Sequence, residues 1–526
     1  MDNEKMEVNW TEPRWDEQAD MVVVGYGGAG ATFAFAAAEQ GADVLILEKG
    51  AQGGGNSVCV AGGLIMTSVD EEESFKYLNW LCAGQTEESV LRHFVASLKD
   101  IPAFQHKLEL PLKDNPQPFS APGFFPEFAG APGAESIKGM SVVAAPGGAG
   151  LYNAISAQAE KAGARVKYST RVTRLIQHPV TRAILGVEAE REDGTTITIR
   201  GRKATVLASG GFEANEAMCK QFLTACPIYF LGSPNLTGDG IRMAQEVGAQ
   251  LWHMNAVAGP LNMGIKTKEG YVYVTYDLNK VAGFGYKSGA FKDGGSLLWV
   301  NRQAKRFHNE TIDTSVVQHG LANRDTWLAT TPGIPEFTNV PAFHIFDEKV
   351  RAGGAAMTTL NSRVPPWSQD NLKELEEGLI IKADTLEELA LKCQWPEIPG
   401  VTKAGHLDPR ALRETVERYN EQCRLNADPE FGRETFLVPF NDEGPYYAIG
   451  PMLPTYLNTH GGPKHDAGQR VLDHHDKPIP GLYAVGECGS LWGPFYNSMG
   501  DIAEFIVSGM TAAKAALSDS EDRKLR

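Results

Sequence analysis

The feature that most constrains the fold is a glycine-rich turn between an apolar strand and an alanine-rich helix. The run "MVVV" at 21–24 predicts a short strand, "GYGGAG" at 25–30 interrupts it, and "ATFAFAAAEQ" at 31–40 predicts a helix. A second apolar run, "VLIL", leads to Glu48. This strand–turn–helix–strand order indicates a βαβ unit at the start of a doubly wound sheet.

The turn carries the spacing G-x-G-x-x-G, formed by Gly25, Gly27 and Gly30. In this arrangement the first glycine permits the turn, the second lets a pyrophosphate approach the backbone, and the third lets the helix pack on the strand. The helix N-terminus directs its partial positive charge toward the phosphates. Glu48 stands where a carboxylate accepts hydrogen bonds from ribose hydroxyls. We interpret the unit as a dinucleotide site rather than a turn without a ligand.

Three further segments favour FAD over NAD. A second glycine-rich loop, "GGGNSVCVAGGLI" at 53–65, contains Asn56 and Ser57 and extends along a longer cofactor. The strand "VLASGGF" at 206–212 ends in small residues, and "NLTGDGIRMAQEVGA" places Thr237 at a helix head. Small residues at strand ends and helix heads allow a flat ring to lie against the backbone.

The regular alternation of strands and helices stops at about residue 256 and returns near the C-terminus. Residues 256–440 are rich in aromatics, prolines and loops, whereas "PIPGLYAVGE" at 478–487 predicts another buried strand, followed by a final helix. We therefore predict an α/β fold in which a discontinuous first domain, 1–255 and 441–526, is interrupted by a second domain.

Composition excludes several other classes. The 526 residues carry 49 Lys and Arg against 65 Asp and Glu, a net charge of −16, which argues against a nucleic-acid partner. No apolar run approaches the ~18 residues that a membrane span needs, and the acidic N-terminus does not resemble a secretory signal. Seven dispersed cysteines form no C-x-x-C pair, so we expect no disulfide scaffold and a reducing, cytoplasmic location.

The quoted segments, with "NRQAKRFHNE" at 301–310, resemble the flavoprotein superfamily of fumarate reductase, urocanate reductase and the 3-ketosteroid dehydrogenases. The resemblance implies a Rossmann-type FAD-binding domain interrupted by an α+β capping, catalytic domain. Relatives with covalent flavin place a histidine in the second glycine loop; loop 53–63 has none, so we expect noncovalent FAD. The residues predicted to bind it are Gly25, Gly27, Gly28, Ala29, Gly30, Glu48, Lys49, Asn56, Ser57, Gly62, Gly63, Val172, Ala208, Gly210, Thr237, Gly238, Asp239, Glu487, Asp501 and Ile502.

The segment "GPFYNSMGDIAE" at 493–504 precedes the last predicted helix. Ile502, Phe505, Ile506 and Met510 form an apolar stripe at helical spacing. By the resemblance, the N-terminus of this helix should point at the flavin pyrimidine, where its dipole and free amides stabilise the negative charge of the reduced ring.

Within the superfamily, this segment separates substrate classes. Fumarate and urocanate reductases place a carboxylate-binding arginine where this chain has Tyr496. Their proton-donor arginine aligns near Thr314, and their substrate-binding histidine with Asn458 or His460, the first being favoured. Because at least two of the three cationic groups are missing, reduction of a dicarboxylate is disfavoured.

The ketosteroid dehydrogenases match better. Tyr496, Ser498 and Gly500 reproduce the Y-x-S-x-G pattern of the Δ4-(5α) branch. There the tyrosine hydroxyl and the glycine N–H hold the ketone oxygen, which favours enolate character, and the serine lies close to the transferred proton. The β-hydrogen is exchanged with flavin N5 as hydride. The leading interpretation is an FAD-dependent oxidoreductase acting on a CH–CH or C=C bond beside a carbonyl of an apolar, steroid-like or other enone substrate.

Several alternatives stay open. An acrylate-type reductase is the second candidate, and a flavin electron-transfer subunit without its own substrate is the third. Tyr496 and Ser498 could instead only cap the helix and pack in the core. The electron partner is unidentified, no metal is predicted, and His474 and His475 read as a solvated turn. Candidates for the proton relay behind Ser498 are Asp313, Thr314, His319, Tyr273, Tyr276 and Tyr286.

Overall fold

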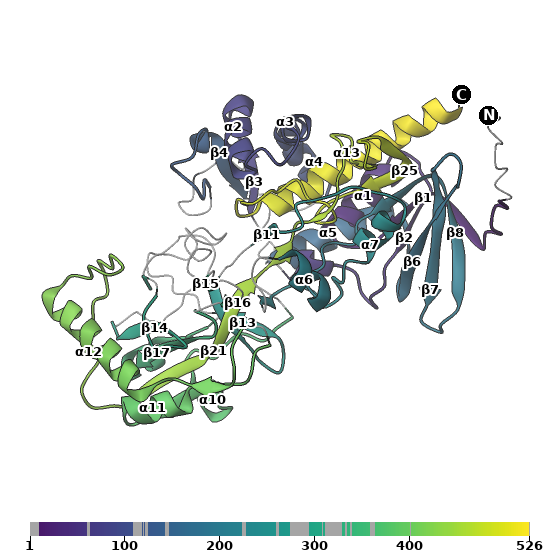
Figure 1. The fold of residues 1–526 in the computed structure, drawn as a ribbon. Helices are drawn as coiled ribbons and strands as arrows, with labels where there is room; N and C mark the ends of the chain where they lie inside the picture. The colour runs from purple at the N-terminus through teal and green to yellow at the C-terminus, as the bar shows by residue number, and fades with distance from the viewer. Residues whose placement is uncertain are drawn as a thin grey trace, which may run out of the picture.

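The structure is a computed structural model with two lobes (Figure 1). It describes residues 10–59, 64–108, 118, 120, 125–141, 147–223, 228–258, 262–273, 294–307, 309–310, 329–331, 334–336, 339–357, 363–399 and 401–524. Within this part of the chain, no helix combines the length and apolarity needed to cross a bilayer.

The first lobe is built on an eight-stranded sheet in the order β24-β25-β8-β1-β2-β5, extended by β7 and β6. The strands are β1 (Glu17–Val24), β2 (Val44–Leu47), β5 (Arg165–Lys167), β6 (Thr170–Gln177), β7 (Ile184–Arg191), β8 (Thr196–Leu207), β24 (Arg470–Leu472) and β25 (Pro478–Ala484). The run from β25 through β8, β1 and β2 to β5 is parallel. The return of β25 to β8 confirms the Rossmann-type fold interrupted by a second unit.

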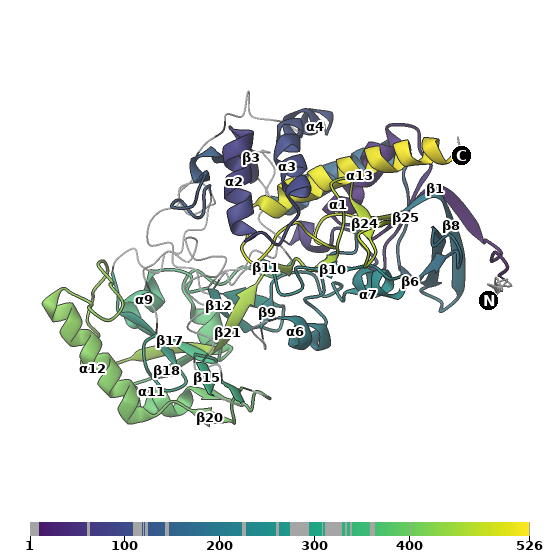
Figure 2. The same ribbon diagram turned by 45° about the horizontal axis from the view of Figure 1, so that its top comes forward.

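Three helices cover one face of this sheet: α1 (Gly28–Ala38), α5 (Gly147–Lys161) and α13 (Gly500–Lys524). The helix α1 packs against both others, and Figure 2 shows α13 running beside it. A Cβ added at Gly509 of α13 would lie 2.8 Å from Thr32 Cβ, so a small residue there permits the close approach. Ile502, Phe505 and Ile506 are buried in the core beneath, as the apolar stripe predicts.

Around this core lie shorter elements of the first lobe. The helices are α2 (Glu71–Leu81), α3 (Glu88–Ser97), α4 (Ile101–Lys107), α6 (Glu216–Phe222) and α7 (Asp239–Glu246), with short 3-10 turns at Gly55–Val58, Leu98–Asp100 and Ala134–Ser136. The paired strands are β3 (Leu64–Ser68) with β4 (Ile137–Ser141), β10 (Leu251–Trp252) with β23 (Gly462–Pro463), and β11 (Val257–Ala258) with β22 (Asn458–Thr459).

The second lobe holds a seven-stranded sheet centred on β21 (Tyr446–Tyr456). Its other strands are β9 (Tyr229–Phe230), β12 (Asn262–Lys266), β13 (Tyr271–Tyr273), β14 (Leu297–Asn301), β17 (Ala342–Asp347) and β18 (Ile380–Ala383). Its helices are α9 (Glu348–Gly353), α10 (Leu372–Glu376), α11 (Leu386–Lys392) and α12 (Pro409–Leu425); the short pairs are β15 (Ala329–Thr331) with β16 (Ile334–Glu336) and β19 (Gln394–Trp395) with β20 (Gly405–His406).

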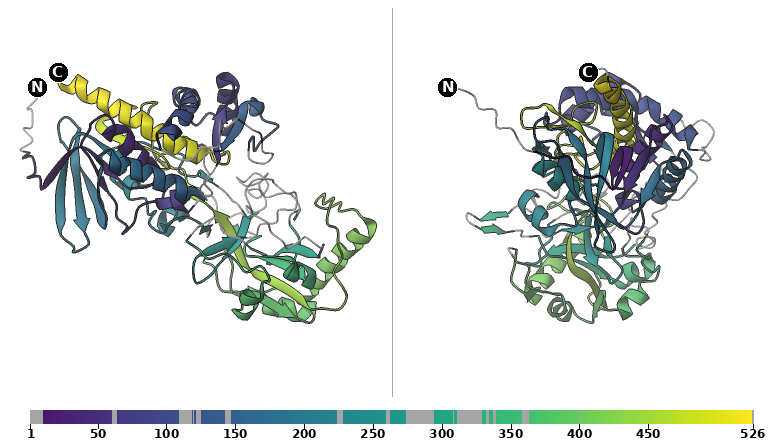
Figure 3. Two further views of the ribbon diagram at one scale, coloured as in Figure 1. Left: turned by 180° about the vertical axis from the view of Figure 1, so that it is seen from behind. Right: turned by 90° about the vertical axis from the view of Figure 1, so that its right-hand side faces the viewer.

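Two strands of this second sheet lie outside the predicted segment 256–440. The strand β21 begins at Tyr446, after the predicted boundary, and β9 lies before residue 256. The strand β21 is long enough both to form the centre of the second sheet and to lead the chain back toward the first lobe (Figure 3), which is why it extends past the predicted boundary. The domain boundaries themselves stay a prediction.

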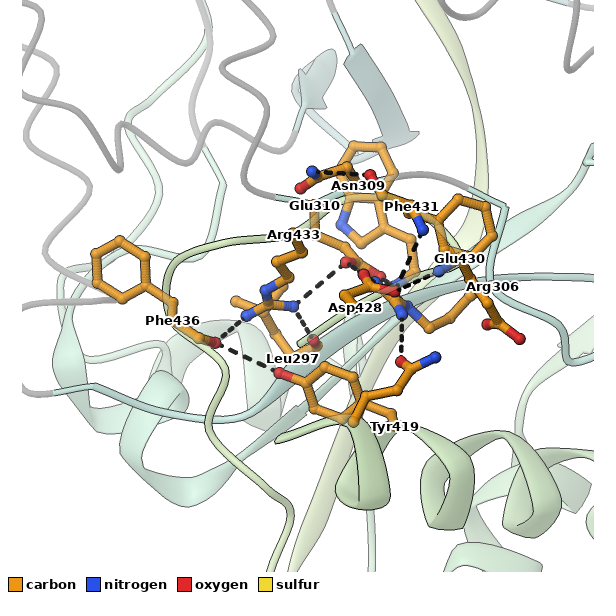
Figure 4. A network of polar contacts seen from close by, with 12 residues as sticks. Leu297, Arg306, Asn309, Glu310, Tyr419, Asp428, Glu430, Phe431, Arg433 and Phe436 are labelled. Carbon is orange, nitrogen blue, oxygen red and sulfur yellow. Dashed lines mark hydrogen bonds and ion pairs between the residues drawn. The ribbon is translucent and has the colours of Figure 1, made fainter. Parts of the chain in front are cut away.

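A buried ionic network holds the second lobe together (Figure 4). Arg306 pairs with Glu310 at 2.7 Å and with Asp428 at 2.9 Å, and Arg433 pairs with Glu310 at 3.2 Å. These four side chains are at most 3% exposed. The "RFHNE" segment is therefore tied, by charges removed from water, to the chain that follows α12.

Candidate flavin and substrate site

The predicted cofactor residues gather where the parallel strands of the first sheet end. Residues 25–30 follow β1, 48–49 follow β2, 208–210 follow β8, and 485–487 follow β25. The second turn of α13 reaches the same edge, since a Cβ at Gly28 or at Gly486 would contact Phe505. Nucleotides bind at the carboxyl ends of strands in sheets of this kind.

The glycine turn has room for a phosphate at one position only. Gly25 has a φ of +103°, and a Cβ there would lie 2.5 Å from Ala208 O. A Cβ at Gly30 would collide with Gly25 O. At Gly27, by contrast, the nearest atoms are 3.9 Å away. The cradle therefore fits a pyrophosphate at the second glycine, as the motif requires.

The carboxylate of Glu48 is nearly buried and accepts two backbone hydrogen bonds. Tyr26 N donates to Oε2 at 2.8 Å and Gly50 N to Oε1 at 2.7 Å. An ionised carboxylate has about four acceptor positions, so this arrangement leaves capacity for ribose hydroxyls. Ser57 joins the same region, because its Oγ accepts a 2.9 Å hydrogen bond from Gly28 N.

The head of α7 is tied to the end of β2. Lys49 Nζ donates to Thr237 Oγ1 at 2.7 Å and pairs with Asp239 Oδ2 at 3.0 Å. Burial alone would raise the pKa of Asp239, but hydrogen bonds from Arg171 and Lys49 hold it well below its usual range. Lys49 thus contacts two other predicted cofactor residues, and Gly238 between those two is the left-handed N-cap of α7.

Asn56 lies between two buried carboxyl groups, that of the predicted residue Glu487 and that of Glu213, which no motif indicated. Its Nδ2 donates to Glu213 Oε1 at 2.6 Å and to Glu487 Oε2 at 3.1 Å, while Ser233 N donates to its Oδ1 at 2.8 Å. Burial raises the pKa of Glu213 to about 7. Burial and the neighbouring Glu213 raise the pKa of Glu487 as well. Glu213 follows "ASGGF" directly, so its place beside that strand end was the available signal.

Tyr496 is buried at the N-terminus of α13. Its hydroxyl accepts a 3.2 Å hydrogen bond from Asp501 N. Its ring packs 5.1 Å from those of Trp492 and His460, measured between centroids. The helix head and the phenol therefore meet, through the amide of Asp501.

The glycine at position 500 has a packing reason. A Cβ there would collide with the Trp492 ring. The Gly500 N–H donates to Asn497 O at 3.0 Å.

The carboxylate of Asp501 contacts both Asn458 and His460. It accepts a hydrogen bond from Asn458 Nδ2 at 3.1 Å and lies 3.1 Å from His460 Nε2. His460 is fully buried, and its Nδ1 has no hydrogen-bond partner among the described residues. Asn458 and His460, both considered for the histidine position of the reductases, thus meet on one carboxylate.

Ser498 is held by a residue that no motif indicated, Glu127. Both Ser498 N and Ser498 Oγ donate to Glu127 Oε2, at 2.9 and 3.0 Å. Glu127 lies in "FFPEFAG", a stretch without a recognisable signature.

The remaining predicted residues lie as follows. Val172 in β6, Ala208 after β8, Ala29 in α1 and Ile502 in α13 are buried, and Gly210 has a φ of +68°. Of the relay candidates, Tyr273 ends β13. The positions outside the described residues are Gly62, Gly63, Tyr276, Tyr286, Asp313, Thr314 and His319.

The family model for the FAD binding domain matches residues 20–501. The chain belongs to this FAD-binding domain family. Its cofactor is FAD, and the superfamily resemblance drawn from the motifs is confirmed. The cradle at Gly27 and the carboxylate of Glu48 agree with that cofactor.

Relatives come from several reductases and dehydrogenases. An NADH:acrylate oxidoreductase of Vibrio harveyi is 26% identical over 92% of this chain, which spans only 48% of that protein. A cytochrome-type fumarate reductase of Shewanella frigidimarina is 27% identical, with 95% of this chain and 77% of that one covered. The 3-ketosteroid delta1-dehydrogenase of Sterolibacterium denitrificans shares the fold, with a TM-score of 0.72, 20% identity, and 95% and 100% of the chains covered. The chain is thus an FAD-dependent oxidoreductase of the group that acts on CH–CH bonds.

Proposed function

We propose that this protein exchanges a hydrogen pair between FAD and a carbon–carbon bond next to a ketone, on an apolar substrate of the ketosteroid or enone type. The observation that carries this is the meeting of the Tyr496 hydroxyl with the N-terminal turn of α13, at 3.2 Å from Asp501 N. A phenol and a helix N-terminus are both suited to a developing oxyanion. Ser498 stands two residues further on, at the same helix head.

In the proposed reaction, Tyr496 donates its O–H to the carbonyl oxygen. Burial, with the carboxylates of Asp501 and Glu127 nearby, holds the pKa of Tyr496 well above its ordinary value, so the phenol keeps its proton. Gly500 N–H exchanges its present acceptor, Asn497 O, for the same carbonyl oxygen. The polarised carbonyl acidifies the α-carbon, and Ser498 carries the α-proton. Bound FAD supplies the chemistry of hydride acceptance and donation.

The charges around Tyr496 favour a neutral substrate over an acrylate. The carboxyl groups of Asp501, Glu127 and Glu487 each raise the pKa of its phenol. A carboxylate substrate placed beside them would be repelled, since like charges in a poorly solvated site cost energy. An acrylate-type reductase therefore remains the second candidate, supported by the names of the relatives rather than by the charges of this site.

A flavin reoxidation screen tests the proposal. The holoprotein is reduced with dithionite without oxygen and mixed separately with 4-androstene-3,17-dione, 2-cyclohexen-1-one, cinnamate and fumarate. We expect the enones to restore the oxidised flavin spectrum faster than the carboxylates. Faster reoxidation by cinnamate or fumarate would favour the second candidate. Reoxidation by none of the four would favour an electron-transfer subunit.

The electron partner and the cellular location complete the proposed function. The relatives' names give NADH as one electron donor, whereas the donor or acceptor of this chain is left unspecified. A cytoplasmic location is proposed from the dispersed cysteines of the sequence.

A further inference from the structure

We propose that Glu127 is the proton acceptor behind Ser498, so that Ser498 and Glu127 form a two-membered proton relay at the head of α13. The inference rests on the proposed function, because Ser498 needs a partner only if it moves a proton. It names a residue outside every segment that the motifs indicated.

The geometry is that of a hydroxyl aimed at one oxygen atom. Ser498 Oγ donates to Glu127 Oε2 at 3.0 Å, and Ser498 N donates to the same oxygen at 2.9 Å. Both side chains are 3% exposed. The amide fixes the carboxylate oxygen at hydrogen-bond distance from the hydroxyl, which is the distance a proton transfer requires.

A second set of hydrogen bonds fixes the position of Glu127 relative to Ser498. Tyr77 OH donates to Asn497 Oδ1 at 2.6 Å, and Glu127 N donates to the same oxygen at 3.1 Å. Asn497 therefore fixes the backbone of Glu127, while its neighbour Ser498 binds the Glu127 side chain. This double attachment holds the Glu127 carboxyl group beside the serine.

The carboxyl group of Glu127 has the chemistry that a proton acceptor needs. A glutamine could accept the same N–H and O–H through its amide oxygen. A carboxylate accepts the same two bonds and, unlike the amide, can also take up a proton.

The balanced step in the direction of dehydrogenation has three transfers. The α-proton of the substrate passes to Ser498 Oγ while the serine proton passes to Glu127 Oε2. The β-carbon loses its C–H electron pair as hydride to oxidised FAD, and the carbon–carbon double bond forms. The substrate is oxidised, FAD is reduced, and Glu127 holds the proton. In the direction of reduction each transfer is reversed.

Four variants test the relay: Glu127→Gln, Ser498→Ala, the two combined, and the control Glu504→Gln. Glu504 is a matched control because it is also buried and accepts from a serine hydroxyl and a backbone amide, Ser490 Oγ and Leu491 N, both at 2.7 Å. The probe is the enone, 4-androstene-3,17-dione or 2-cyclohexen-1-one, that reoxidises the reduced wild-type holoprotein faster. The readouts are the reoxidation rate, its solvent deuterium isotope effect, and the FAD content.

We expect Glu127→Gln and Ser498→Ala each to slow reoxidation roughly 10²-fold, the scale of losing acid–base assistance. The double variant should be no slower than either single one, because both remove the same relay. The solvent isotope effect should change in these variants, FAD should stay bound, and Glu504→Gln should resemble wild type.

Three results would overturn the relay. The first is a Glu127→Gln rate within about threefold of wild type. The second is equal slowing by Glu127→Gln and Glu504→Gln, and the third is multiplying losses in the double variant. If Glu127→Gln does not fold, the Ser498→Ala variant is sufficient as a test. A wild-type reoxidation rate and isotope effect in that variant would overturn the relay. If no enone reoxidises the flavin of the reduced wild-type protein, that result contradicts the proposed function rather than the relay.

Discussion

The side-chain amide of Asn56 donates to two buried carboxyl groups at once, Glu213 Oε1 at 2.6 Å and Glu487 Oε2 at 3.1 Å. Two carboxylates that share one donor repel each other when both are ionised. Because burial raises the pKa of Glu213 to about 7, and that of Glu487 is raised as well, the pair retains a proton near neutrality. The loop of the second glycine segment is thereby joined to the strand ends after β8 and β25.

The raised pKa values of this pair predict that the free energy of unfolding falls as the pH rises from about 5 to about 8. The folded pKa of Glu213 is about 7 against an ordinary value of 4.5, so the folded state binds more protons in that window. The stabilisation that protonated Glu213 contributes is fully present below its ordinary pKa. It is lost as the pH rises through the pKa that Glu213 has in the folded protein. The loss should be on the order of 2 kcal/mol. Thermal unfolding of the holoprotein at several pH values measures it.

The control for that experiment is Glu213→Gln, which keeps a neutral group beside Asn56 and Thr459. Thr459 Oγ1 donates to Glu213 Oε2 at 3.0 Å, and the amide oxygen of a glutamine can accept that bond. We expect the pH dependence in the variant to be clearly shallower. An identical slope in both proteins would show that another group titrates in this window.

The second prediction concerns the buried ionic network of Figure 4. Arg433→Met should destabilise the protein by about 3–5 kcal/mol, since it leaves Glu310 with one cation fewer in a site removed from water. Lys403→Met is the matched control, because Lys403 pairs with Glu397 while 86% exposed. It should cost less than about 1 kcal/mol. Denaturant unfolding of both variants measures the difference, and comparable losses would contradict the argument.

The first lobe was predictable because its signals are local. Gly25, Gly27 and Gly30 have spacings that a single turn imposes, and the apolar runs at 21–24 and 44–47 form parallel neighbours in the sheet. The buried strand at 478–487 was predictable from its apolar run after an irregular segment, whereas its pairing with β8 is a finding of the structure. The central strand β21 lies after the predicted segment 256–440, and no local signal joins it to the second sheet, because its sheet partners are distant in the sequence.

The candidate site was less predictable, because its contacts join distant segments. Glu127 lies 371 positions before Ser498, in a stretch with no periodic or motif signal. Asn56 and Asp501 are predicted to bind FAD, and the structure in addition joins each of them to protein side chains that no motif indicates as their partners. Gly500 was predicted through its N–H, and the structure adds a packing reason for a glycine there, because a Cβ would collide with the ring of Trp492. A sequence pattern identifies residue types, and only the packed structure shows which neighbour each one meets.

The third prediction concerns retention of FAD. Glu48→Ala should weaken FAD binding roughly ten- to a hundredfold, since it removes a charged hydrogen-bond acceptor. The flavin-to-protein absorbance ratio after dialysis measures retention. Glu188→Ala, in which an exposed ion pair with Arg174 is lost, should retain flavin like wild type. Acid precipitation should release all the flavin from wild type as FAD, because loop 53–63 has no histidine. Retention by Glu48→Ala, or flavin left in the precipitate, would contradict these expectations.

The last prediction isolates the phenol of Tyr496. Tyr496→Phe keeps the ring that packs on Trp492 and His460 and removes only the hydroxyl. Turnover with an enone should fall roughly 10²-fold or more, the scale of losing one oxyanion donor, while FAD stays bound. Tyr483→Phe is the control, because Tyr483 is also buried and its hydroxyl donates to Asp519 at 2.6 Å. Unchanged turnover in Tyr496→Phe would reduce that hydroxyl to a partner of the Asp501 amide, and the chemistry would then need another donor.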